Sequence, residues 1–247
     1  MLDLFTDPAV WASFATLAIL EIILGVDNVI FISIVAGKLP EAQRKNAMRL
    51  GLGLALIMRI GLLFSIAWIV SLTTPVFSAF GFDFSWRDLI LLGGGLFLLY
   101  KAATEIFEEV EGGHLHTAEE QVVQAAFMSV IVQIVILDLV FSFDSVLTAV
   151  GIAEHIEVMI AAVVVAIAVM MLAAQPIANF VQAHPSTKML ALAFLVMIGM
   201  ALVAEGFHFH VEKGFIYAAM AFAGGVEALN LWRQKRRVRT AAQNPAE

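Results

Sequence analysis

Seven apolar segments dominate this chain, and each is long enough to cross a lipid bilayer, which takes about 20 residues of helix. Hydrophobic residues make up 61% of the sequence and the mean hydropathy is +0.92, whereas soluble domains are roughly 45–50% apolar. We therefore predict an all-α, polytopic membrane protein embedded in a lipid bilayer. The predicted spans cover residues 9–36, 48–72, 88–107, 125–150, 157–181, 188–206 and 214–232.

Lysine and arginine are distributed unevenly between the loops that these spans would create. The loops on one side of the membrane hold only Arg87 and Lys213. The loops on the other side and the C-terminal tail hold Lys38, Arg44, Lys45, Arg49, Lys188, Arg233, Lys235, Arg236, Arg237 and Arg239. Because positively charged loops tend to stay in the cytosol, we predict an outward N-terminus and a basic cytosolic tail over residues 233–247. The expected location is the bacterial inner membrane. The N-terminal segment has no basic region before its apolar stretch, so we expect it to remain as the first span rather than to be removed as a signal peptide.

Two short stretches inside the predicted spans resemble each other closely, and both contain acids. They are Glu21-Ile-Ile-Leu-Gly-Val-Asp27-Asn28-Val29 and Asp138-Leu-Val-Phe-Ser-Phe-Asp144-Ser145-Val146. An ionisable group at the centre of a bilayer costs roughly 2.5–3.5 kcal/mol on insertion scales, so such acids indicate a function. A matched pair in two halves of a chain is typical of secondary transporters built from structural repeats.

The two motifs divide the chain into two units of three spans each. Residues 9–107 form the first unit and 125–206 the second, and 214–232 remain as an extra helix. Since three is odd, the second unit must be inverted relative to the first. A weaker similarity relates the segment that ends at Glu105 to the segment that ends at Glu205; inversion would place Glu105 at the cytosolic end and Glu205 at the outer end.

The polar side chains of the two motifs all carry oxygen ligands. They are Glu21, Asp27, Asn28, Asp138, Asp144 and Ser145. Oxygen ligands suit Mg²⁺, Ca²⁺ or Mn²⁺, so we predict a divalent-metal site. On a straight helix Asp27 points about 100° away from its neighbour Asn28. We therefore expect local unwinding near Gly25, and near its counterpart Ser142, to gather the side chains on one ion.

A structural interpretation competes with this metal site. Arg59 and Lys101 are the cations inside the predicted spans, and they could hold the acids as buried ion pairs. Two bases cannot pair all four motif acids, and the repeat places the acids symmetrically, which favours the functional interpretation.

Other features exclude several classes of function. The chain has no cysteine, hence no thiolate metal site or disulfide. It has no nucleophile–base pattern, phosphate loop or dinucleotide fingerprint, so we predict neither an enzyme nor an organic cofactor. Nucleic acid is not an expected partner, because the basic run abuts a span. The acidic linker over residues 105–124 either attracts divalent cations or is only solvated, and His208 and His210 either receive a metal or anchor the chain at the interface.

At these motifs the chain resembles the TerC family of integral membrane proteins. The resemblance covers essentially the whole chain and lies in residues 21–31, 138–146 and 205–222. It implies a seven-helix protein distantly similar to the LysE exporters, with a role in Mn²⁺ efflux, and the six motif residues as the metal site. It also implies a link of some members to exported metalloproteins or the protein-export machinery. The third stretch particularly resembles family members with cytosolic CBS domains.

The leading hypothesis is a divalent-cation exporter, with Mn²⁺ as the transported ion. Export against an inside-negative potential costs about 4.6 kcal/mol per 100 mV for a divalent ion, so exchange for protons at the same carboxylates is expected. A non-transporting membrane assembly or metallation factor for exported proteins is the alternative. Export of another solute, such as an amino acid, fits four intramembrane acids less well.

Overall fold

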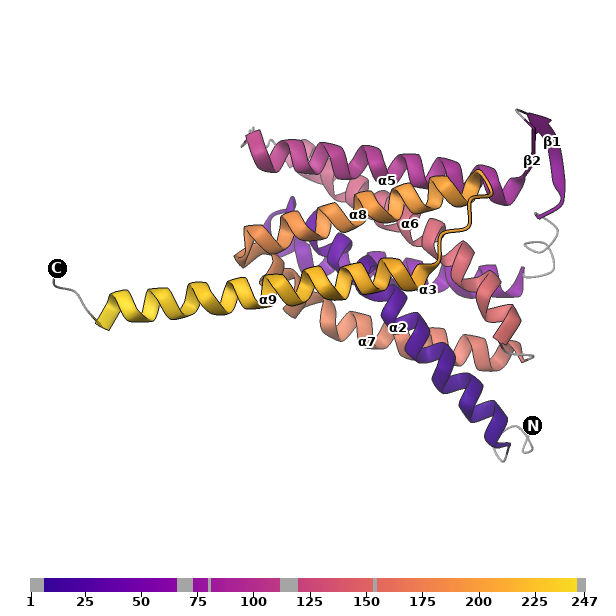
Figure 1. Ribbon diagram of the computed structural model, residues 1–247, viewed down its shortest axis with the longest axis horizontal. Coiled ribbons are helices and arrows are strands. Elements are labelled where there is room, and N and C mark those ends of the chain that lie inside the picture. Colours follow the sequence, from indigo (N-terminus) through magenta and orange to yellow (C-terminus); the bar gives the residue numbers. More distant parts are fainter. Residues whose placement is uncertain (1–6, 66–72, 80, 112–119, 153–154, 244–247) are drawn as a thin grey trace.

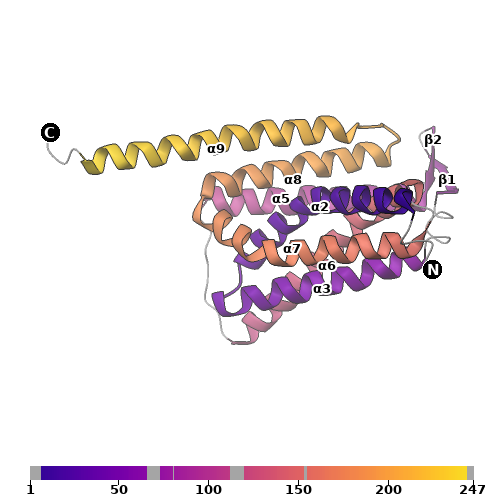
Figure 2. The same cartoon turned by 90° about the horizontal axis from the view of Figure 1, so that it is seen from below.

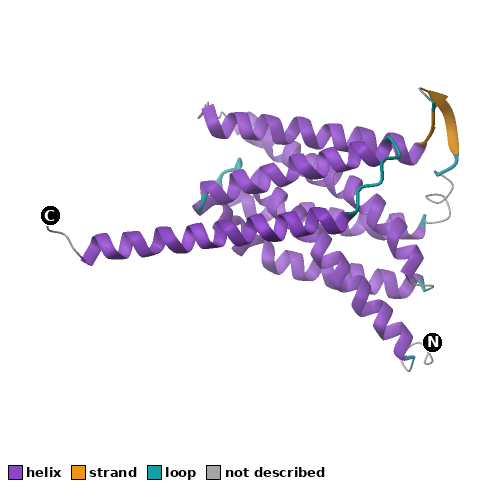
Figure 3. Cartoon of the chain, viewed as in Figure 1, coloured by secondary structure: helices purple, strands orange, loops and turns teal. Residues whose placement is uncertain are grey.

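The computed structural model describes residues 7–65, 73–79, 81–111, 120–152 and 155–243. Within this part of the chain, seven helices lie side by side, with a two-stranded hairpin at one end (Figures 1 and 3). The elements are α2 (Pro8–Gly37), α3 (Glu41–Phe64), β1 (Pro75–Ala79), β2 (Phe82–Ser85), α5 (Trp86–Glu111), α6 (Glu120–Ile152), α7 (Ile156–Ala183), α8 (Pro185–Gly206) and α9 (Lys213–Gln243).

The apolar character of the helices confirms a polytopic membrane protein. Six helices are long and apolar enough to cross a membrane, and the apolar part of α6 that the structure describes is the shorter stretch Ala126–Ser142. Predicted spans one, three, five and six agree with α2, α5, α7 and α8 to within a few residues. Many large apolar side chains on the outer faces are exposed, Leu172 being 80% exposed, as expected for helices that face lipid.

Local signals explain where several helices begin. Asp7 caps α2 by accepting a hydrogen bond from the Ala9 N–H at 2.8 Å, and Pro8 is the first residue of that helix. Before α5, the Ser85 hydroxyl accepts a hydrogen bond from the Asp88 N–H, while the Asp88 carboxylate accepts one from the Ser85 N–H at 2.8 Å. This reciprocal pair is a capping box, so the hairpin leads directly into α5.

One predicted boundary is wrong, and two further features were not predicted. The second span was expected to reach residue 72, but α3 begins at Glu41 and ends at Phe64, and Ser65 caps it; residues 66–72 lie outside the described part. The hairpin of β1 and β2 is an addition to the all-α expectation. The predicted basic tail begins within a helix, because α9 continues from the last span to Gln243. Lysine and arginine are good helix formers, and nothing in that stretch breaks the helix.

The expected breaks at Gly25 and Ser142 are also wrong, because α2 and α6 are continuous helices through both positions. Gly25 has another role: a Cβ atom there would lie 2.4 Å from the Sδ atom of Met170 in α7. The missing side chain thus lets α2 and α7 pack closely. Ser142 contributes its hydroxyl group to a buried polar cluster.

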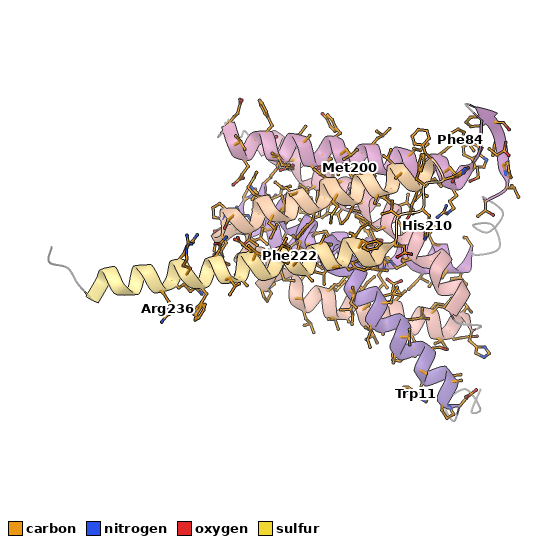
Figure 4. The ribbon with its side chains drawn as sticks, viewed as in Figure 1. Trp11, Phe84, Met200, His210, Phe222 and Arg236 are labelled. Carbon is orange, nitrogen blue, oxygen red and sulfur yellow. The ribbon has the colours of Figure 1, made fainter. Side chains whose placement is uncertain are left out.

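The helices form a bundle in which α2 packs on α7, α5 on α8, and α3 on α6. Figure 2 shows α9 beside α8, extending well beyond the rest of the bundle. In Figure 4, Phe222 lies on the part of α9 beside the bundle and Arg236 on the part that projects. The Glu227 carboxylate joins the two helices by accepting hydrogen bonds from Ser186 at 2.5 Å and from Thr187 at 3.3 Å.

Candidate ion-binding site

Arg59 of α3 lies at the centre of a buried polar cluster, with only 3% of its side chain exposed. Its Nη1 atom donates to the Glu21 carboxylate of α2, and its Nη2 atom donates to Asp138 Oδ1 of α6 at 2.9 Å. The first acids of the two sequence motifs therefore meet on one guanidinium group. Two carboxylate partners on different helices suit the planar fork of arginine, which a lysine ammonium group does not offer.

Ser142 completes the cluster from the second motif. Its hydroxyl group accepts a hydrogen bond from Arg59 Nε at 2.9 Å and donates one to Asp138 Oδ2 at 3.0 Å. Both Asp138 oxygens thus have a donor. Buried charges are tolerated only when they are paired and hydrogen-bonded, and this arrangement meets that requirement for Arg59 and Asp138. Two carboxylates share a single guanidinium, so the cluster keeps an excess of acid.

A cavity of about 70 Å³ adjoins the cluster. Its polar lining comes from five helices and consists of Asn28, Arg59, Ser145, Glu205 and Tyr217. Apolar residues of α2, α6, α8 and α9 form the rest of the wall. A buried water needs about 10–15 Å³, so the cavity has room for an ion with part of its hydration shell.

Asn28 presents an unusual oxygen beside this cavity. The side chain is 5% exposed, and its Oδ1 atom has no hydrogen-bond partner among the residues that the structure describes. A buried acceptor without a donor costs roughly 1–3 kcal/mol. Ser145, the counterpart of Asn28 in the second motif, is 3% exposed and directs its hydroxyl hydrogen to the Ser142 carbonyl at 3.2 Å.

The structure brings together four of the six predicted ligands and divides them into two groups. Glu21 and Asp138 bind Arg59, whereas Asn28 and Ser145 line the cavity. The side chains of Asp27 and Asp144 lie outside the described part of the chain. Among the described side chains, no group of three or more histidines or acids is arranged to hold a metal. The six-residue ligand set therefore stays a prediction.

The competing ion-pair interpretation is confirmed for the pairs of Arg59 with Glu21 and Asp138. Among the described side chains, Lys101 pairs with Glu105 in the next turn of α5, at 3.4 Å, and not with Glu21 or Asp138. Sequence reasoning gave Arg59 no part in the site beyond that of a counter-ion, although a lone arginine inside a span was a signal. Glu205 was marked only by a weak similarity, and no sequence signal marked Tyr217 as a lining residue.

Ion pairs join the helices at the end of the bundle where α2 ends. Lys38 binds Glu105 at 2.7 Å and Glu108 at 2.6 Å, and Lys188 at the start of α8 binds Glu109. Burial lowers the pKa of Lys38, but hydrogen bonds and charge attraction from the two glutamates outweigh burial and raise the pKa above 10.5. Lys38 is therefore charged at neutral pH. Residues 112–119 of the acidic linker lie outside the described part.

The opposite end of the bundle carries the hairpin and the histidines. His208 Nε2 lies 3.1 Å from Asp88 Oδ2, which ties the end of α8 to the start of α5. The backbone of His208 has φ 63°, a left-handed conformation unusual for a residue other than glycine. Figure 4 shows Phe84 and His210 at this end. The two expectations for these histidines, metal transfer and interfacial anchoring, both stay predictions.

The fold and the buried cluster define a polytopic integral membrane protein with ionised groups between its helices. The chain belongs to the integral membrane protein TerC family, whose model matches residues 6–242. The UPF0053 inner membrane protein YgdQ of Escherichia coli (strain K12) is 53% identical over 94% of this chain and 96% of YgdQ. A UPF0053 protein of Haemophilus influenzae is 51% identical over 94% of this chain and 97% of its own length.

A longer relative shows the same membrane part within a larger protein. The UPF0053 inner membrane protein YoaE of Escherichia coli (strain K12) is 50% identical over 99% of this chain, which spans 47% of YoaE. No solved structure matches the chain.

Proposed function

We propose that this protein is a divalent-cation exporter of the bacterial inner membrane, with Mn²⁺ as its transported ion. One observation carries the proposal: motifs from distant parts of the chain meet at a buried cluster beside a cavity. Asn28 lines this cavity, and its Oδ1 atom has no hydrogen-bond partner among the described residues. A purely structural ion pair needs no such cavity. Ionised groups and unpaired acceptors inside a membrane are costly, so their grouping around a cavity favours a pathway for ions.

The chemistry of the cavity supports a hard cation. The described polar side chains around it supply oxygen from an amide, a hydroxyl and a carboxylate, in Asn28, Ser145 and Glu205. The sequence places Asp27 next to Asn28 and Asp144 next to Ser145. Oxygen ligands of this kind suit Mn²⁺, Mg²⁺ and Ca²⁺. The choice of Mn²⁺ among them rests on the family resemblance.

The pairing of helices supports two inverted repeats. If α2, α3 and α5 correspond to α6, α7 and α8, then the packing of α2 on α7 corresponds to that of α3 on α6, and both are present. The correspondence exchanges α5 with α8, so the packing of α5 on α8 is unchanged by it. The contacts at the ends of these two helices show the same exchange. Asp88 at the start of α5 meets His208 just after α8, and Lys188 at the start of α8 meets Glu109 near the end of α5.

In the proposed mechanism the two repeats rock about the cavity and expose it alternately to each side. The end that holds Lys38 and Lys188 faces the cytosol, by the positive-inside rule, and the hairpin faces outward. Export against the membrane potential is driven by protons that bind the same carboxylates after the metal leaves.

The alternative function is a membrane assembly or metallation factor for exported proteins that transports nothing. The full pairing of Arg59 and Asp138 favours it, because a static ionic cluster can hold α2, α3 and α6 together without any ion. In that case replacing the motif acids by uncharged amides would reduce stability or partner binding rather than ion flux.

Manganese accumulation in cells that lack their own exporters tests the proposal. Cells under manganese stress would express the intact protein, Asp27→Asn, Asp144→Asn or the control Glu227→Gln, all at equal membrane levels. Glu227 is an acid of α9 that bonds Ser186 and lies outside the cavity lining. We expect the intact protein and the control to lower cell manganese, and either aspartate substitution to abolish the effect.

The opposite result would reject manganese export. If all four proteins leave cell manganese at the level of the empty vector, the transport proposal fails for this ion. If the aspartate variants still lower it, the motif acids are not the transport site.

A further inference from the structure

Arg59 occupies the position that an incoming cation would need. Its guanidinium group uses nitrogen atoms on all sides of its fork to bind Glu21, Asp138 and Ser142. The same side chain also lines the cavity beside Asn28 and Ser145. Arginine remains charged at any physiological pH, so this cation cannot be removed by losing a proton. It can only be displaced.

We propose that Arg59 is a tethered counter-ion that competes with the transported cation for Glu21 and Asp138. This inference rests on the proposed transport function. Without a bound cation, Arg59 neutralises part of the charge of the two acids through its ion pairs. A divalent cation that enters the cavity gains these carboxylates as ligands only when the guanidinium group moves away. Loss of the cation then lets the guanidinium group return.

The surroundings of Arg59 provide room and a second partner for this movement. The cavity of about 70 Å³ borders the side chain, so the guanidinium group can leave the acids without entering a packed wall. Glu205 of α8 lies on the same cavity. Movement of the guanidinium group into the cavity would bring it toward an acid on a helix other than α2 and α6, which would link ion binding to the position of α8.

The charge balance of the site explains why a tethered counter-ion would be useful. An empty site with two unpaired carboxylates would be costly to carry through the membrane. With Arg59 in place, a fixed positive charge offsets one of the two carboxylates when the site reorients without metal. The tethered cation would also speed release by replacing the metal at its ligands.

The affinity for Mn²⁺ distinguishes an Arg59 that competes with the metal from an Arg59 that only anchors the helices. The full-length protein, purified in detergent, would be titrated calorimetrically with Mn²⁺ as the intact protein, Arg59→Gln and Arg59→Lys. Removal of a nearby positive charge strengthens the binding of a divalent cation, so we expect Arg59→Gln to lower the Kd at least about tenfold. Arg59→Lys keeps the charge but cannot bridge both acids, so we expect a smaller decrease in Kd.

Transport by the same proteins in sealed vesicles provides the second measurement. Tighter binding without the competitor slows release, so we expect both variants to transport Mn²⁺ at least about fivefold more slowly than the intact protein despite their lower Kd. A static anchor predicts the reverse for affinity, since its loss would disorder the ligands and raise the Kd. Thermal unfolding verifies that each variant is folded. If Arg59→Gln does not fold, the Kd and transport rate of Arg59→Lys decide between competition and anchoring.

The outcomes distinguish the two proposals. If the intact protein neither binds nor transports Mn²⁺, the proposed function fails. If the intact protein does both, but the folded variants bind Mn²⁺ equally or more weakly, the function stands and the competition of Arg59 with the metal is rejected.

Discussion

At the scale of single residues, three donors of one guanidinium group decide how the two motifs are joined. Arg59 reaches α2 through Glu21 and α6 through Asp138 and Ser142. The motif pattern predicted that acids from two helices would lie together, and Glu21 and Asp138 do meet at Arg59. It did not predict that Glu21 and Asp138 would share an arginine, because charge pairing depends on which face of α3 meets them.

Ser142 should matter more than its small size suggests. Ser142→Ala would remove the hydroxyl group that bonds Arg59 Nε and Asp138 Oδ2, and each lost contact to a buried charged group costs about 1–3 kcal/mol. The matched control is Ser33→Ala, since Ser33 is equally buried but bonds only the Val29 carbonyl of its own helix. Thermal unfolding in detergent should show a clear decrease for Ser142→Ala and little change for Ser33→Ala. Equal effects would mean that the Ser142 hydroxyl adds nothing to the cluster.

At the scale of the elements, glycines determine how closely helices approach. A Cβ atom on Gly95 of α5 would lie 2.8 Å from the Gly199 carbonyl oxygen of α8, and one on Gly199 would lie 3.1 Å from the Gly95 carbonyl oxygen. The contact is mutual and involves backbone atoms, which cannot rotate away. The α5–α8 crossing is therefore as tight as two helix backbones allow, as is common in membrane bundles.

Gly95→Ala should force α5 and α8 apart. We expect a destabilisation of about 1–3 kcal/mol, typical of overpacking, and a corresponding decrease in unfolding temperature. Gly93→Ala in the same glycine triplet is the control, because no atom lies within 4 Å of the added Cβ there. That substitution should be neutral or slightly stabilising, since alanine favours helix. A tolerated Gly95→Ala would contradict the close crossing.

At the scale of the whole molecule, the ends of the bundle differ in charge. Lysine–glutamate pairs join the end at which α2 finishes, whereas the hairpin and Asp88–His208 occupy the other end (Figure 1). This asymmetry supports the proposed orientation, in which the projecting part of α9 carries Arg233, Lys235 and Arg236 into the cytosol.

Labelling of single cysteines tests this orientation, and the chain is suited to it because it contains no cysteine. Lys45→Cys at the start of α3 and Asp83→Cys in β2 change exposed residues near opposite ends. With a membrane-impermeant thiol reagent on intact cells stripped of their outer membrane, we expect Asp83→Cys to react and Lys45→Cys to react only after lysis. The reverse pattern would invert the topology and make the proposed direction of transport wrong.

The sequence alone determined the class of this protein. Hydropathy is a local property of the chain, so long apolar segments specify membrane helices whatever their neighbours are. The same holds for the two acid motifs, which were visible without a structure. Boundaries were less certain: the hairpin after α3 and the helical extension of α9 follow from capping and propensity rather than from hydropathy.

Only the tertiary structure decided what the motifs contact. The pairing of Glu21 and Asp138 with Arg59, the cavity beside Asn28 and the close fit of Gly25 to Met170 all join residues far apart in the chain. Straight helices needed no unwinding to bring the first acids together, because packing of α3 between them supplied the shared cation. Such contacts depend on which helix faces pack together, and that choice is made by the whole bundle rather than by any one segment.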